Sequence, residues 1–323
     1  MIQLHHDRLS FGGVTISFQR TLRIPDDGKA YPLPPGLGRF PLRRVNDYAD
    51  RVPASWVAHG GVFLPMYQRE AMWLSFGAAE PTALKVGVGK ICAVSGERWS
   101  DGLRASAQNY VVAGTQPWLD GIATGHGTVR QFVAMPLGLG YTVEGQVTGE
   151  EVHGGIQLQA YPAKPGAIPP PPPRMRSAMP MGAATSMCAP MPCAPQDGEM
   201  GIAAGGRMTQ KIYPDPHGLK VWDQTAGKRL FVHIVNSMQW REITGEEPPS
   251  TPVTAKSYAN AGFPWFKLYD EAAPTIAPSD ALAGVKSIKA IDAGSSTVPL
   301  QDDESIMPAK VHGLPLSVAD GEW

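Results

Sequence analysis

Glycine and proline interrupt this chain so often that little room is left for long helices. The 323 residues include 36 glycines and 32 prolines. Proline fixes its own φ angle and lacks a backbone donor, and glycine costs a helix conformational entropy. Short strands and turns should therefore outnumber helices, while apolar residues at 43% suffice for a substantial core. We expect an α+β fold that is predominantly β in its N-terminal part, with an all-β fold as the alternative.

Alternating apolar and polar residues mark the first strand, Val14 to Phe18, directly after a turn at Gly12 and Gly13. Strand-like patterns recur at 83–95 and 229–235. Between Thr128 and Pro162, glycine-rich turns separate three further segments: 129–135, 141–147 and 156–161. This spacing predicts a three-stranded meander.

An abrupt change of composition divides the chain. From residue 163 to about 206, five consecutive prolines precede a mixture of methionine, alanine, proline and cysteine with almost no large branched side chains. Such a segment cannot build a core. We therefore expect four parts: a β-rich domain over 1–162, an exposed, disordered linker over 163–206, a strand-plus-helix region over 207–291 that packs on the first, and an acidic, mostly disordered tail over 292–323.

Short helices should close the folded part. Thr254 can cap a helix over 255–261 that Gly262 ends, and Ser279 can cap another. Between them we expect a turn that opens at Pro264. Large side chains crowd this turn and make it a candidate protein-interaction segment: Phe263, Trp265, Phe266 and Tyr269. Because so short a segment cannot cover them, they should dock on the N-terminal β domain or, alternatively, on a neighbouring subunit.

Charge and cysteine content argue against several classes of function. The 28 basic and 29 acidic residues give a net charge of −1, so no overall field attracts nucleic acid or an anionic membrane. The N-terminal residues lack a signal-peptide pattern, and nowhere do about 18 apolar residues follow one another. Three cysteines and the lack of an Asn-x-Ser/Thr site fit a reducing compartment. We expect a soluble, cytoplasmic protein.

Polar side chains inside strand-like segments are the candidates for a ligand site: Arg69, Glu70 and Trp73 in one group, and Arg130, Tyr141 and Glu144 in another. Buried charges have to be paired, so structural ion pairs are the first interpretation and a ligand pocket is the alternative. Gly-x-Ser-x-Gly and His-Glu-x-x-His are both absent, and Gly89-Lys90 lacks the other residues of a phosphate-binding loop. We expect no cofactor, and no catalytic residue can be named.

Six sulfur-bearing side chains lie within the linker: Met179, Met181, Met187, Cys188, Met191 and Cys193. Soft thioether and thiolate ligands select Cu(I), which makes copper handling a hypothesis. The alternative is a low-complexity linker that binds no metal. We prefer the linker, because ordering a flexible segment around an ion costs about 1 kcal/mol or more per residue.

Two stretches are similar to known sequences: Arg130-Gln131-Phe132-Val133-Ala134-Met135-Pro136-Leu137-Gly138, and Asn236-Ser237-Met238-Gln239-Trp240-Arg241-Glu242-Ile243-Thr244-Gly245. They resemble an uncharacterised microbial protein family usually labelled hypothetical. The likeness covers about residues 1–290 outside the insertion, and it implies an integral two-part architecture without an activity, cofactor or site residue.

These observations favour a non-enzymatic binding or assembly protein of unknown specificity, with a protein partner or self-association and room for a small-molecule ligand. One alternative is an enzyme of unrecognised type with a pocket in the β domain. The other is copper handling through the Met/Cys-rich insertion.

Overall fold

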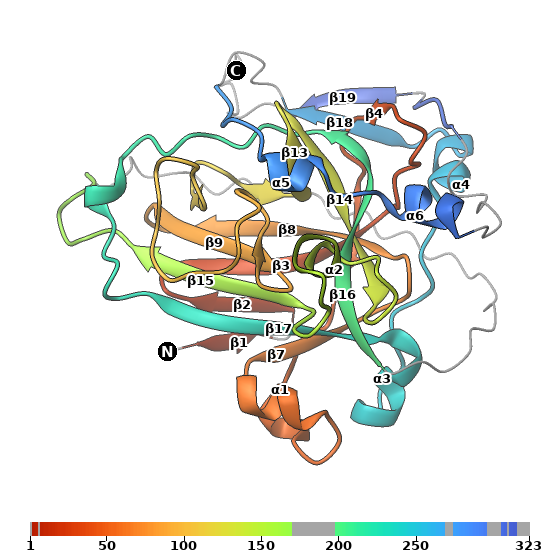
Figure 1. Ribbon diagram of the computed structural model, residues 1–323, viewed down its shortest axis with the longest axis horizontal. Coiled ribbons are helices and arrows are strands. Elements are labelled where there is room, and N and C mark those ends of the chain that lie inside the picture. The colour runs from red at the N-terminus through yellow and green to blue at the C-terminus, as the bar shows by residue number, and fades with distance from the viewer. Residues whose placement is uncertain are drawn as a thin grey trace, which may run out of the picture.

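The computed structural model describes residues 2–5, 7–169, 198–268, 274–295, 305–308 and 310–314 (Figure 1). Its fold is α+β and mostly β, as the composition predicts. One large, mainly antiparallel sheet dominates, accompanied by short helices and a small parallel sheet. No helix within these ranges is long and apolar enough to cross a bilayer.

The large sheet contains the strands β1 (Gln3–His5), β2 (Arg8–Phe11), β3 (Val14–Thr21), β4 (Ala30–Tyr31), β5 (Gly36–Arg39), β6 (Arg43–Arg44), β7 (Val62–Met66), β8 (Ala71–Ala78), β9 (Thr82–Val88), β10 (Ile91–Cys92), β11 (Val111–Ala113), β12 (Trp118–Leu119), β13 (Gly121–Gly125), β14 (Thr128–Pro136), β15 (Ile156–Pro162), β16 (Glu199–Thr209) and β17 (Lys228–Asn236). The small sheet pairs β18 (Pro264–Leu268) with β19 (Lys310–Leu314). The α-helices are α1 (Ala54–His59), α2 (Val143–Thr148), α3 (Ser237–Thr244), α4 (Ala255–Asn260), α5 (Asp280–Ala283) and α6 (Ile288–Gly294).

Hydrogen bonds connect the main strands of the large sheet in the order β1, β2, β3, β8, β14, β16, β17, β15 and β9. The arm made of β2, β3 and β8 and the arm made of β17, β15 and β9 overlap in Figure 1. Both arms contribute to one buried core, with Phe18 and Leu74 from the first arm and Val86, Leu158 and Val232 from the second. The sheet therefore folds over on itself around this core.

The second arm is buried on both of its faces. Leu84, Val86 and Val88 point into the core, and Lys85 between them lies on the other face. The Lys85 ammonium donates to the carbonyl of Gly102 at 2.9 Å and lies 4.7 Å from the centre of the Trp99 ring. A loop therefore covers the outer face, which explains why β9 is buried at every position. The strands predicted around 83–95 and 229–235 are confirmed as β9, β10 and β17.

Strand β16 begins at Glu199, inside the range 163–206 where we expected a linker. It pairs with β14 over most of its length and with β17 at its start. The region after the insertion thus contributes strands to the same sheet as the region before it. Residues 170–197, which include all six candidate copper ligands, lie outside the described residues.

The predicted three-stranded meander over 128–162 is wrong. Residues 129–135 and 156–161 do form strands, but β14 and β15 pair with other partners, and 141–147 contributes the helix α2 instead of a strand. The Thr142 hydroxyl accepts a hydrogen bond from the Gly145 amide at 3.0 Å, and Gly149 ends the helix with a φ of 83°. These two caps outweigh the strand-like alternation between them.

The C-terminal helices begin where predicted. The Thr254 side chain accepts from the Ser257 amide to cap α4, and the Ser279 side chain caps α5. Residues 280–294 form two helices, because a second cap at Ser287 starts α6.

The aromatic segment after α4 is a strand, where we expected a turn. Within it, β18 exchanges two backbone hydrogen bonds between Phe266 and Leu33, at 2.8 and 3.0 Å. The Trp265 side chain is fully buried in the main core, and its ring centre lies 6.4 Å from that of Tyr31. The segment therefore docks on the N-terminal part of its own chain. Phe263 is 48% exposed, and Tyr269 lies outside the described residues.

Replacing Trp265 with alanine should lower the free energy of unfolding by about 3 to 5 kcal/mol, because a fully buried indole leaves a cavity. The matched change Phe263→Ala, two residues away on an exposed side chain, should cost about 1 kcal/mol or less. Urea denaturation of both variants measures the difference. Equal effects, or a Trp265→Ala protein with unchanged stability, would contradict the burial described above.

Candidate functional site

The six ligand candidates taken from the sequence are spread over several contacts. Glu70 is buried and accepts a hydrogen bond from the Arg20 guanidinium at 2.8 Å and another from the Tyr67 amide at 2.9 Å. Arg130 lies 3.2 Å from the carboxylate of Asp26. The Trp73 ring packs edge to face against Trp118, with 6.4 Å between ring centres. These contacts connect β3, β8 and β14 to a neighbouring strand or loop.

Arg69 and Tyr141 meet at one carboxylate, that of Asp292 in α6. The Arg69 guanidinium donates to both oxygens at 2.8 and 2.9 Å, and the Tyr141 hydroxyl donates to Oδ1 at 2.6 Å. Burial alone would raise the pKa of Asp292, but the hydrogen bonds from Arg69 and Tyr141 outweigh it and lower the pKa. This charge-assisted cluster fastens α6 to the sheet.

Glu144 in α2 accepts three backbone hydrogen bonds, from the amides of Val152, His153 and Gly154 at 2.9 to 3.1 Å. The carboxylate is buried and shapes the loop that leads into β15. Glu144 therefore has a structural contact of its own, with other partners than those of Arg130 and Tyr141.

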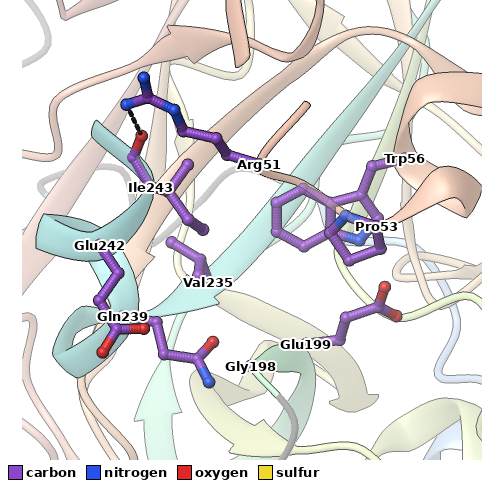
Figure 2. A pocket seen from close by; sticks show the side chains of 9 residues that line it. All are labelled: Arg51, Pro53, Trp56, Gly198, Glu199, Val235, Gln239, Glu242 and Ile243. Carbon is purple, nitrogen blue, oxygen red and sulfur yellow. Dashed lines mark hydrogen bonds between the residues drawn. The ribbon is translucent and has the colours of Figure 1, made fainter. Parts of the chain in front are cut away.

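A pocket of about 330 Å³ lies between α1 and α3, over the adjoining ends of β16 and β17 (Figure 2). Its lining comes from separate stretches of the chain: Arg51, Pro53 and Trp56; Gly198 and Glu199; Val235; and Gln239, Glu242 and Ile243. Figure 2 shows Gln239 and Glu242 on the α3 side, with Glu199, Pro53 and Trp56 opposite them. The pocket thus has an apolar part and a polar rim.

Local sequence places α3 at this pocket. The Asn236 side chain accepts a hydrogen bond from the Met238 amide at 3.1 Å to start the helix, and Gly245 ends it with a φ of 76°. Trp240 and Ile243, three residues apart, are buried under the helix. Gln239 and Glu242, also three residues apart, therefore share the neighbouring face and line the pocket.

The carboxylates of the rim are open to a ligand. Glu199 accepts a hydrogen bond from the Ser55 hydroxyl at 3.2 Å and is half-buried, while Glu242 is exposed. Within the described ranges, neither of them forms an ion pair. Arg51 is already engaged, since it donates to the carbonyl of Ile243 at 3.3 Å and lies 3.7 Å from the carboxylate of Asp50.

A buried histidine supports the Trp56 side of the pocket. The His233 ring stacks between the rings of Trp56 and Phe231, with ring centres 4.5 and 4.3 Å apart, and its Nε2 donates to the carbonyl of Gly60 at 3.0 Å. Burial lowers the pKa of His233 to about 4. Its imidazole is therefore neutral near pH 7.

A second, shallower hollow of about 630 Å³ lies between α2 and the α5–α6 segment. Lys286 and Gln146 are the polar side chains of its lining. The Gln146 carboxamide accepts from the Lys286 amide at 2.7 Å and donates to the carbonyls of Tyr141 and Lys286 at 3.0 and 3.1 Å. These groups already satisfy each other. The pocket between α1 and α3, with its open carboxylates, is the better candidate for a site.

The comparisons with known proteins add no function: no family model, no curated protein and no solved structure matches this chain. In the part of the chain that the structure describes, no three His, Cys, Asp or Glu side chains are placed to hold a metal ion. The copper hypothesis concerns residues 179–193, outside that part, and stays a prediction.

Sequence reasoning missed the pocket, because its residues come from segments that are far apart in the chain. One signal pointed near it. The stretch Asn236–Gly245, which carries part of the resemblance, forms the whole of α3 with both of its caps. It supplies Gln239, Glu242 and Ile243 to the lining of the pocket.

His233 should make the protein less stable in mild acid. Its pKa is about 4 when folded against 6.5 in its ordinary environment, so the unfolded chain binds the extra proton as the pH falls from about 6.5 to about 4. The substitution His233→Phe keeps a ring in the stack and removes the imidazole that takes up this proton. From about pH 7 to about pH 5 the variant should lose about 2 kcal/mol less stability than the wild type, measured by urea denaturation at both values. Parallel pH profiles would refute the assignment.

Proposed function

We propose that this protein is a non-enzymatic binding protein and that its ligand or partner enters the pocket between α1 and α3. The observation that carries this proposal is the pairing of an apolar surface with open carboxylates. Pro53 is exposed and offers an apolar contact above the buried side chains of Trp56, Val235 and Ile243, and Glu199 and Glu242 offer charge at the rim. A concave apolar surface with a few polar groups is the usual form of a binding site.

The environment of the two carboxylates favours binding over catalysis. Acid–base catalysis by a carboxylate pair needs surroundings that differ, so that one group stays protonated while the other is ionised. Here Glu242 is exposed and Glu199 is half-exposed. Water can solvate both, and neither has the enclosed surroundings in which such a carboxylate pair works.

A protein partner, a second copy of the chain and a small molecule all fit this role. The balanced net charge of −1 argues against nucleic acid as the partner. We place the protein in the cytoplasm, because three cysteines in 323 residues make no disulfide framework, and the described one, Cys92, is a buried free thiol.

Blocking the pocket tests this proposal. A library of small molecules and short peptides is screened by thermal shift against the wild type and against Glu242→Trp, which puts an indole over the pocket. A ligand at about 100 times its Kd should stabilise the wild type by about 2.7 kcal/mol and leave Glu242→Trp unchanged.

Glu80→Trp is the matched control, because it makes the same substitution at an exposed glutamate that does not line the pocket. It should respond to each ligand as the wild type does. Ligands that stabilise Glu242→Trp as strongly as the wild type, or no stabilising ligand at all, would contradict a binding role for this pocket.

A further inference from the structure

We propose that the pocket between α1 and α3 recognises a basic side chain, lysine or arginine, presented by a protein partner. This inference rests on the proposed binding function and names the chemistry of what is bound. It follows from the charge of the rim, the nature of the floor and the surface around the pocket.

The fixed charge at the rim is negative. Glu199 and Glu242 stand on opposite sides of the pocket in Figure 2. The Arg51 guanidinium is the one positive group in the lining, and the carboxylate of Asp50, 3.7 Å from its Nε, offsets it. Two carboxylates without an ion-pair partner among the described residues therefore remain, and a cation placed between them interacts favourably with both.

The floor suits the remainder of a basic side chain. Lysine and arginine carry an apolar stem that packs on apolar surface while the charged head stays at a polar rim. The exposed ring of Pro53 supplies such a surface, with the buried side chains of Val235 and Ile243 beneath it. A fully polar ligand would leave this floor unused.

The exposed apolar residues around the pocket indicate that its ligand is a polypeptide and not a free amine. Val57 in α1 is 39% exposed and Met238 in α3 is 56% exposed, and these two helices form the walls. Around a central anchor, such residues exclude water and add contact area for the neighbouring residues of a partner chain. A small amine would reach the pocket and leave both of them bare.

Fluorescence anisotropy with labelled decapeptides tests the inference. The probes alternate glycine with lysine, with arginine, or with the uncharged norleucine. The lysine and arginine peptides should bind the wild type, and the norleucine peptide should bind at least about tenfold more weakly. Raising the salt concentration should weaken the basic peptides, since partly exposed charges are screened.

Variants assign the binding to this site. The double variant Glu199→Gln/Glu242→Gln should bind the lysine peptide about tenfold more weakly. The control Glu80→Gln/Glu150→Gln removes the same charge from two exposed carboxylates outside the pocket and should bind as the wild type does. Each variant is first shown to keep the melting temperature of the wild type. If Glu199→Gln/Glu242→Gln melts lower, Glu242→Gln alone serves, because the Glu242 side chain has no hydrogen bond within the described residues.

The two proposals fail in different ways. Equal loss of binding in the pocket variant and in the control, or equal affinity for the norleucine peptide, would overturn recognition of a basic side chain. The binding function would still stand if another ligand stabilised the wild type and not Glu242→Trp. If no ligand distinguished those two proteins, the binding function itself would be refuted.

Discussion

The double pairing of β16 is the contact on which the rest of this structure depends. On one side β16 continues the sheet from β14, and on the other its first residues pair with β17. Without it, the two arms of the sheet would each present one apolar face to water and the core between them would be open. The same contact sets Glu199 opposite Val235 and gives Gly198 a hydrogen bond from the Asn236 amide at 3.0 Å. The pocket is therefore a product of the register that closes the sheet.

Ion pairs of long sequence separation reinforce this closure. Arg20 reaches Glu70 across 50 residues, Arg130 reaches Asp26 across 104, and Arg69 reaches Asp292 across 223. Breaking such a pair by removing one partner leaves an unpaired charge in a buried setting, which typically costs 3 to 5 kcal/mol. These charges therefore specify which segments lie together. They are distinct from the carboxylates of Glu199 and Glu242 at the pocket, which form no ion pair among the described residues.

How much of the fold and of the pocket the sequence predicts depends on how far along the chain each sequence pattern extends. The strand at Val14, the strand pair after Thr82 and the caps at Thr254 and Ser279 were found because period and cap chemistry are local. The segment 141–147 is misleading for the same reason: its local alternation predicts a strand, whereas the caps at Thr142 and Gly149 make it a helix. The candidate residues at 69–70 and 130 were expected to form ion pairs, yet their partners could not be named from a single sequence. The pocket was out of reach altogether, because an exposed Glu242 on a short helix looks like any solvated surface residue.

The parallel pairing of β7 with β17 carries a consequence for biosynthesis. Val62 lies opposite Val232, so β7 waits for a partner made 170 residues later. At about 5 to 20 residues per second, a ribosome needs roughly 10 to 30 s to cover that distance. During this interval the apolar strand Val62–Met66 has an unpaired edge, the feature that invites aggregation. The native pairing of β7 thus waits until β17 has been made, and a nascent chain that pauses before residue 228 leaves this edge unprotected.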